Sequence, residues 1–454
     1  MTRASLYPVA KLSSCTKKTS LCFSTPLLLW RRKMPSITGS SSSLLASPSV
    51  AAHISNESHP LMMIEPGEED EDGRSMCRFY DYVNEKVVNT NTKIPKEVDD
   101  AICVGSSHGW LAYVSRLDCS VFLWSPFTTS PLIWLPPIHT LPFVKVIPCE
   151  ELADDEHKDG DISAYDDDFS SDFGFKVEFE DQNRSQRYCT MSTKLLSLDI
   201  IQKIVLSSAP TSDDCIVVAL PIYKIRHSIA FCKPGDKSWT FVEPPLEKSF
   251  HLIDVIHFNN QLFYAVSCCG LTLYAYNLSD LSSPKSYLLE TSFDFEPLSS
   301  LEERMRSWYK DRYYLVESLG DLLWVRRLIA NNMDDDGKFT FSHDAKIFPD
   351  QTVTFDVYKL DFSRNTWEFA KCIGDQVLFL GTNQSLSLSA RDFDKLQANR
   401  IYFTDDSFTI HKKYPNYGGH DFGDYELGGS AFSEFRFRGT KILPPPFWVM
   451  RNFH

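Results

Sequence analysis

The chain has 454 residues, enough for one large or two ordinary domains. Apolar residues make up 43 %, charged residues 23 % and aromatic residues 13 %, which indicates a folded globular protein and favours strands over helices. The formal net charge of −14 argues against a phosphate-binding surface, and no apolar run approaches the ~20 residues needed to span a bilayer, so we expect neither a nucleic-acid partner nor a membrane span.

The N-terminal segment differs in charge from the rest of the protein. Seven basic residues and no acidic one precede Glu57, which leaves 39 basic against 60 acidic residues over 57–454, a formal charge of −21. Residues 1–56 are also rich in serine and threonine, as organellar transit peptides are. We therefore expect import into an organelle, first the mitochondrion and alternatively the chloroplast, with the nucleus or cytosol as the third choice. A disordered tail without targeting function is the other interpretation of this segment.

A linker and a long β-rich region follow the leader. Residues 57–75 form an acidic linker, and from residue 76 short apolar-aromatic runs end at turn residues. After a first hairpin at 76–89, four-strand units recur at intervals of roughly 40–60 residues, the spacing of propeller blades. The expected strands are 101–104, 110–114, 120–124 and 132–135; 203–206, 215–220, 228–231 and 239–242; 252–258, 262–266, 271–276 and 286–289; 312–316, 322–328, 353–360 and 367–370; and 377–380, 386–388, 400–403 and 434–437. The pattern predicts an all-β protein, a β-propeller of five or six four-stranded blades over residues 76–450, with a β-sandwich as the structural alternative.

The last strand of several units contains a tryptophan. Trp134, Trp239 and Trp367 each stand in such a strand. We expect the outer strand of a blade to pack this large aromatic group against the neighbouring blade, after a tight polar turn has brought the backbone there.

Insertions separate some of the units. Residues 150–172 carry eleven acidic residues and are expected to be a disordered insertion, with a shorter one at about 331–350. Short helices are expected at 301–310 and 389–396, and the Gly-, Tyr- and Asp-rich stretch 414–430 is expected to cross one face of the ring.

Several segments, taken in order, resemble a known plant family. They are Gly105 to Leu111, Trp124 to Phe127, Ile229 to Asp236, Val377 to Gly381, Asn399 to Asp406 and Pro444 to Trp448. Together they resemble the "domain of unknown function 295" group, the KIB-type F-box-associated β-propellers, over about residues 76–450. The resemblance implies a propeller that binds a target protein. Members usually carry an N-terminal F-box, which hands the target to a ubiquitin ligase; here the basic leader occupies that place, as in the organelle-targeted branch of the family.

One serine lies in a pattern that hydrolases use. Gly105-Ser106-Ser107-His108-Gly109 matches G-x-S-x-G, a motif that requires a strand-to-helix elbow with the serine at a helix N-terminus. Here Trp110 to Val114 continues as a strand. We therefore interpret Ser107 and His108 as residues of a turn between strands, and predict no catalytic residue.

Candidate metal and nucleotide sites are equally weak. Asp155 to Asp166 and Asn332 to His343 only partly match the calcium-loop pattern. His420-Asp421 with Asp424 could begin a metal site, but the sequence does not identify the third ligand that would complete it. The twelve cysteines show no zinc spacing and are expected to be free thiols, and no phosphate-binding glycine motif occurs. Arg326-Arg327 and Lys412-Lys413 are interpreted as solvated strand ends. We predict no metal site, no cofactor site and no cofactor.

The sequence favours a non-catalytic interaction module inside an organelle. Its expected partner is a protein that the sequence does not identify, and the sequence leaves the oligomeric state open. The first alternative is an F-box-type substrate receptor of a ubiquitin ligase in the nucleus or cytosol. The second is an enzyme with a pocket in the central channel of the propeller.

Overall fold

The computed structural model describes most of the region beyond residue 58. The described residues are 59–64, 75–148, 173–180, 186–222, 228–243, 251–259, 261–267, 270, 272–294, 306, 309–330, 351–406, 421–429, 432–433 and 447–450, and all belong to one unit, Ala51–His454. The expected leader, the acidic insertions at 150–172 and 331–350, the strand at 434–437 and nearly all of the helix at 301–310 lie outside them.

Six sheets of four or five strands form the blades that the structure describes. Blade one contains β29 (Phe447–Val449), β1 (Leu61–Ile64), β2 (Met76–Asp81) and β3 (Lys86–Lys93); blade two contains β4 (Ala101–Ser107), β5 (Trp110–Ser115), β6 (Val121–Trp124) and β7 (Ile133–Leu135). Blade three contains β11 (Ile201–Leu206), β12 (Val217–Pro221), β13 (Ala230–Cys232) and β14 (Thr240–Phe241); blade four contains β15 (Leu252–Phe258), β16 (Leu262–Ser267), β17 (Thr272–Asn277) and β18 (Lys285–Glu290). Blade five contains β19 (Ser292–Asp294), β23 (Thr366–Phe369), β22 (Gln351–Asp361), β21 (Asp321–Ala330) and β20 (Lys310–Ser318); blade six contains β25 (Leu386–Ser389), β24 (Gln376–Leu380), β26 (Arg400–Phe403), β27 (Gly423–Glu426) and β28 (Phe432–Ser433).

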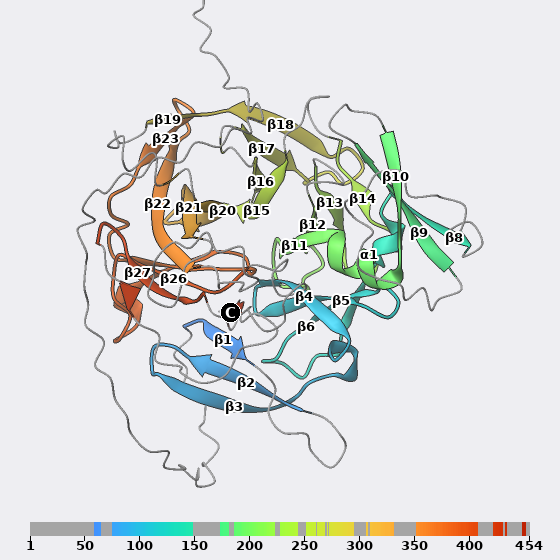
Figure 1. Ribbon diagram of the computed structural model, residues 1–454, viewed down its shortest axis with the longest axis horizontal. Coiled ribbons are helices and arrows are strands. Elements are labelled where there is room, and N and C mark those ends of the chain that lie inside the picture. Colours follow the sequence, from blue (N-terminus) through green and yellow to red (C-terminus); the bar gives the residue numbers. More distant parts are fainter. Residues whose placement is uncertain are drawn as a thin grey trace, which may run out of the picture. The chain divides into compact units, whose positions relative to one another are not determined.

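The inner strands of consecutive blades contact one another. β4 packs against β11, β11 against β15 and β15 against β20; β20 then contacts β25, and β29 contacts β4. In Figure 1, β4, β11, β15 and β20 lie around the middle of the unit that comprises residues 51–454, and outer strands such as β14, β18 and β23 lie farther out. The expected propeller is confirmed, and the described sheets settle the blade count at six rather than five.

The ring is closed by a sheet that joins both ends of the propeller. β29 pairs antiparallel with β1, with Leu61 opposite Val449. This corrects the expected boundary, because residues 61–64 are a buried strand inside the segment assigned to an acidic linker. The strand is four residues long and lies beside acidic stretches, and its partner is almost the whole propeller away, so local pattern did not reveal it.

Apolar clusters fill the spaces between blades. Each of six buried clusters combines residues from two consecutive blades, for example Val205 and Val218 of blade three with Val255 and Phe263 of blade four. Side chains alternate between the two faces of a strand, so a strand within a blade contributes to the cluster on each side. The core is therefore divided among the seams rather than gathered in one place.

The outer-strand tryptophans follow the expectation in two blades out of three. Trp239 is buried and its indole N–H donates to the Pro136 carbonyl of blade two, at 2.7 Å. Trp367 is also buried, and its indole N–H donates to Thr291 Oγ1 at 3.1 Å. Trp134 is different: half of its surface is exposed, and it packs against Phe122 of its own blade.

Other departures involve elements that interrupt the blade repeat. A three-stranded sheet, β8 (Val144–Pro148), β9 (Phe173–Glu180) and β10 (Gln186–Met191), and helix α1 (Thr193–Asp199) lie between blades two and three in sequence and were not predicted. The helix expected at 389–396 is wrong: only a 3-10 turn, Ala390–Asp392, forms there. Within 414–430, residues 423–426 form β27 instead of a loop crossing the ring. Two further 3-10 turns cover Lys96–Val98 and Ile138–Thr140.

Candidate functional site

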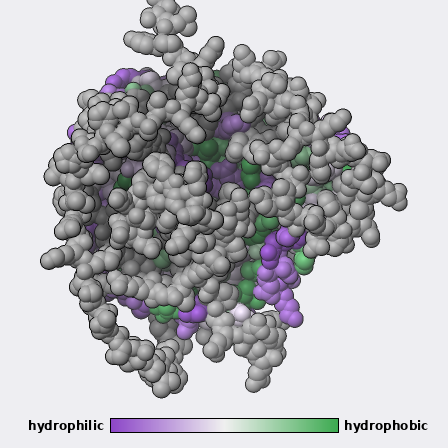
Figure 2. Space-filling view, viewed as in Figure 1, coloured by the Kyte–Doolittle hydropathy of each residue, from purple (hydrophilic) through white to green (hydrophobic). Residues whose placement is uncertain are grey.

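A cavity of about 440 Å³ lies among the inner strands of four blades, and a fifth blade also contributes to its lining. Its walls come from β4, β11, β15 and β20, with α1 on one side and the segments that follow β24 and β26 on another. Apolar wall residues include Ile102, Ile201 and Ile253, while Tyr313 and Arg312 add an aromatic and a charged surface. We call this the inner cavity. Its size and mixed lining are those of a ligand or side-group pocket. Figure 2 shows one face of the protein, where both hydrophobic and hydrophilic residues are visible near the middle.

β-Bulges occur near the start of the inner strands that line the cavity. The strand pairing shifts register between Cys103 and Gly105 in β4, between Ile201 and Lys203 in β11, and between Leu252 and Asp254 in β15. A bulge redirects a residue that a regular strand would place on the other face. Lys203 and Asp254, which directly follow two of these shifts, both line the inner cavity.

Lys203 and Asp254 form a buried ion pair that joins three blades. The Lys203 ammonium donates to Asp254 Oδ1 at 2.5 Å, and both groups are less than a tenth exposed. Asp254 Oδ2 accepts from the Leu315 backbone N–H of blade five at 2.7 Å. The charges thus satisfy each other and the backbone, which buried ions require. The pair therefore fixes the geometry of the cavity rather than offering a free charge.

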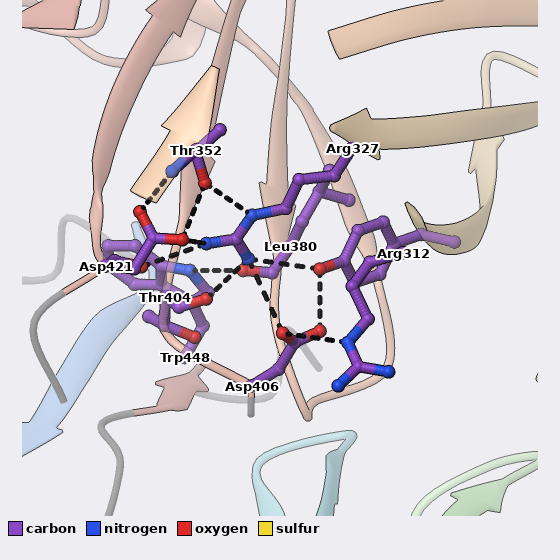
Figure 3. Close-up of polar contacts among 9 residues, drawn as sticks. Arg312, Arg327, Thr352, Leu380, Thr404, Asp406, Asp421 and Trp448 are labelled. Carbon is purple, nitrogen blue, oxygen red and sulfur yellow. Dashed lines mark hydrogen bonds and ion pairs between the residues drawn. The ribbon is translucent and has the colours of Figure 1, made fainter. Parts of the chain in front are cut away.

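Arg327 is the centre of a second buried network, between blades five and six (Figure 3). Its guanidinium donates to the carboxylate and the backbone carbonyl of Asp421, to the Thr404 carbonyl and to Thr352 Oγ1, at 2.7 to 3.0 Å. Its Nη1 also donates to the Tyr314 hydroxyl at 3.1 Å. Burial disfavours the charge, but Tyr314 and the surrounding carboxylates raise the pKa of Arg327 above its ordinary value. This residue was expected at a solvated strand end and is fully buried, so that expectation was wrong.

Asp406 connects this network to the inner cavity. One of its oxygens lies 3.7 Å from Arg327 and 3.8 Å from Arg312, and the other accepts from the Tyr314 hydroxyl at 2.6 Å. Arg312 and Arg327 stand directly opposite each other on β20 and β21. Like charges in opposed positions repel, and the shared carboxylate offsets that repulsion.

The structure places Ser107 and His108 in a hairpin turn, as expected. Ser107 pairs with Trp110, and His108 and Gly109 between them have φ of 51° and 75°, the backbone of a two-residue type I′ turn. The Ser107 hydroxyl lies 2.9 Å from His108 Nδ1 and donates to the Gln384 amide oxygen. No helix follows the serine, so the hydrolase elbow does not form.

The acidic residues near position 420 belong to two separate networks. Asp421 pairs with Arg327, whereas Asp424 accepts from the Arg400 guanidinium and from the Tyr82 hydroxyl of blade one. His420, both calcium-like loops and Lys412-Lys413 lie outside the described residues. Within the described part of the protein, no group of three His, Cys, Asp or Glu residues is arranged to hold a metal ion.

The described cysteines are distributed through the blades without pairing. All seven are free thiols, most of them buried, and the described lining of the inner cavity contains no serine and no cysteine. No described helix is both long and apolar enough to cross a bilayer.

Sequence reasoning missed the inner cavity and its residues Lys203, Asp254 and Arg312. They lie on three different inner strands, β11, β15 and β20, more than 100 residues apart at the extremes. No local pattern marks them, because they come together only when the inner strands of different blades meet.

The six radially arranged sheets, whose strands are mostly antiparallel, define the class: this is a β-propeller. The chain belongs to the KIB1-4 beta-propeller family, whose model matches residues 79–426. It is similar to the putative F-box protein At5g55150 of Arabidopsis thaliana, with 30 % identity over half of this chain and 55 % of the relative. It is also similar to F-box protein SKIP23 of the same plant, with 25 % identity over 55 % of this chain and 57 % of the relative.

The chain thus spans about half the length of the curated relatives it matches. Among solved structures, a functionally unknown protein from Desulfotomaculum acetoxidans aligns over 87 % of this chain and 99 % of its own, with 8 % identity and a TM-score of 0.33. That likeness carries no argument about function. The resemblance to the KIB-type F-box-associated propellers is confirmed.

Proposed function

We propose that this chain is a non-catalytic propeller that binds a protein partner at the inner cavity, inside an organelle and in the first instance the mitochondrion. The observation that carries the proposal is the inner cavity, to which five of six blades contribute. A rigid ring that presents one mixed apolar and charged hollow is suited to receive a protruding segment of a partner. The family supports a protein as that ligand.

The non-catalytic part of the proposal rests on the chemistry of the lining. Lys203 and Asp254 are engaged with each other, and the described lining has no serine or cysteine; Thr382 and His251 are its remaining aliphatic hydroxyl and imidazole groups. A nucleophile within reach of a base is the arrangement that covalent catalysis needs. The enzyme alternative predicts a turnover that is lost on substitution of cavity residues, whereas our proposal predicts binding without turnover.

Partner capture from intact cells tests the binding site. Proximity labelling with the full-length protein identifies neighbours, and each is then tested against purified protein. Ile222 and Ile253 are two partly exposed cavity residues. Replacing both by glutamate is expected to weaken binding of the direct partner at least tenfold. Leu117→Glu is the matched control, because Leu117 is 72 % exposed on the turn between β5 and β6. Equal binding by the cavity variant and the control would refute the assignment.

The organelle part of the proposal rests on the leader alone. A fusion of residues 1–60 to a fluorescent protein is expected to enter mitochondria, and N-terminal sequencing of the imported protein is expected to begin well after Met1. Accumulation in chloroplasts would replace the first compartment by the alternative. A diffuse nuclear and cytosolic signal would overturn import.

The names of the relatives favour one second candidate, a substrate receptor of a ubiquitin ligase. That role requires an F-box in the full protein in addition to the propeller. Affinity purification of the full-length protein with the ligase scaffold, lost when the segment before residue 59 is removed, would support this candidate. Recovery of the direct partner without any scaffold protein would favour the interaction module.

A further inference from the structure

The inner cavity contains one cationic group that the surrounding protein leaves available. Arg312 lies on β20, and its side chain is 43 % exposed. Its Nε is 3.8 Å from Asp406, too far for a hydrogen bond. Among the described residues, neither terminal nitrogen has a hydrogen-bond or ion-pair partner, and in Figure 3 both point away from the network.

Arg327, which lies opposite Arg312 in the neighbouring strand β21, is an arginine of the same protein whose guanidinium is fully hydrogen-bonded. Its side chain is 1 % exposed and donates to carboxylate, hydroxyl and carbonyl oxygens. Asp406 cannot complete the Arg312 site, because its second oxygen already accepts from the Tyr314 hydroxyl. Arg312 therefore keeps a pair of parallel N–H donors, the fork that binds a carboxylate in bidentate fashion.

The neighbouring groups restrict which anion fits. Asp199, Asp311 and Asp406 also line the cavity, so a dianion such as a phosphate group would be repelled more strongly than a single negative charge. Ile102, Ile201 and Ile253 form an apolar wall in the same hollow. A ligand that joins one carboxylate to an apolar stem matches both features.

We infer that Arg312 is a specificity-determining residue that receives one carboxylate of the protein partner, carried on an apolar stem inserted into the inner cavity. The inference rests on the proposed function and adds the chemistry of the partner's contact. The carboxylate comes either from an acidic residue or from the C-terminus of the partner, since both present the same planar group.

Small probes test the chemistry with the full-length protein. N-acetyl-leucine carries a terminal carboxylate, N-acetyl-glutamic acid α-amide carries a γ-carboxylate, and N-acetyl-leucinamide is the neutral match. Calorimetry or ligand-detected NMR is expected to show binding of at least one carboxylate, with the neutral probe at least tenfold weaker. The tighter of the two carboxylates identifies the source. Equal binding of the neutral probe, or tighter binding of phenyl phosphate than of phenylacetate, would overturn the inference.

Variants connect the probes to the residue. Arg312→Gln is expected to weaken binding of the carboxylate probe at least tenfold. Arg312→Lys keeps the charge but loses the pair of parallel N–H donors, and is expected to weaken binding by an intermediate factor. Arg391→Gln is the control for lost charge, because Arg391 is 82 % exposed and does not line the cavity. Thermal unfolding of each variant shows whether it has folded, and an Arg312→Gln protein that folds and binds as the original does would refute the assignment.

The same variants separate this inference from the proposed function. If the Ile222 and Ile253 variant and the Arg312→Gln variant both fail to bind the partner, the binding site and the carboxylate contact are both supported. If it is lost by the cavity-wall variant and retained by Arg312→Gln, the carboxylate contact is wrong while the binding site holds. If both variants retain it, both are wrong.

Discussion

Two parts of the ring hold neighbouring blades together in different ways. The seam between blades one and two and the seam between blades two and three are packed with apolar and aromatic groups, such as the stacked rings of Phe79 and Phe127. The seams on either side of blade six contain buried charges as well as apolar clusters: Arg327 with Asp421 on one side, and Asp424 with Tyr82 on the other.

The irregularity of blade six explains the difference. Its strands β24 and β26 run parallel, so a longer connection replaces a tight hairpin between them. The backbone around this blade leaves carbonyls that regular hairpins would pair internally. Arg327 donates to the carbonyls of Thr404 and Asp421. Buried side-chain donors bind these carbonyls where the blade is irregular, because an unpaired buried carbonyl is costly.

Removal of Arg327 is expected to have the largest effect. Arg327→Met retains much of the volume but leaves Asp421 as an uncompensated buried charge, so we expect a loss of about 3–5 kcal/mol in unfolding free energy. Chemical denaturation of the full-length protein measures it. Arg116→Met is the control, since the Arg116–Asp100 pair is exposed and should contribute less than about 1 kcal/mol. Similar losses in both variants would remove the distinction between buried and exposed pairs.

The apolar side is expected to be sensitive to added volume instead. A Cβ at Gly105 would lie 2.3 Å from the Ile204 carbonyl oxygen, where β4 meets β11. A backbone atom cannot move aside as the end of a flexible side chain can. Gly105→Ala is therefore expected to lower the free energy of unfolding by about 1–3 kcal/mol. Denaturation measures the loss, and a variant as stable as the original would show that this seam is looser than described.

The two outer-strand tryptophans of blades two and three provide a matched pair. Trp239→Phe removes the buried donor to Pro136 and leaves a carbonyl unpaired, so we expect a loss of about 1–2 kcal/mol. Trp134→Phe changes a half-exposed ring and is expected to cost less than about 0.5 kcal/mol. The comparison fails if the order of the two losses is reversed.

The smallest predicted effect is a pH dependence. Burial first, and then the nearby His108, lower the pKa of His257 from 6.5 to about 4, although a hydrogen bond with the Ser207 backbone opposes this. The unfolded protein therefore takes up a proton below pH 6.5 that the folded protein refuses until about pH 4. Stability from this group is complete above pH 6.5 and is lost as the pH falls towards 4. Because the imidazole is partly exposed, we expect only about 1 kcal/mol. His257→Gln should flatten stability between these two pH values, and an unchanged slope would contradict the assignment.

Sequence pattern predicted most strands of blades two to five because most of them pair with a near neighbour in the sequence; β21 and β22, which are 20 residues apart, are an exception. Ser107 to Trp110 is such a case, since glycine at a positive φ marks the hairpin. The pairing of Leu61–Ile64 with Phe447–Val449 could not be found this way, as nothing local connects the two segments. The inner cavity was hidden for the same reason. Arg327, however, stands between the apolar runs Leu322–Val325 and Leu328–Ala330, and that contrast could have indicated a buried charge.

The central claim is that a protein partner occupies the inner cavity, and hydrogen exchange of the complex tests it most directly. Once the direct partner is identified, amides of β15, β20 and α1 are expected to gain protection when it binds, while those of the outer strands β3 and β18 remain as in the free protein. Protection confined to the outer strands would place the partner on the rim of the propeller and contradict the account.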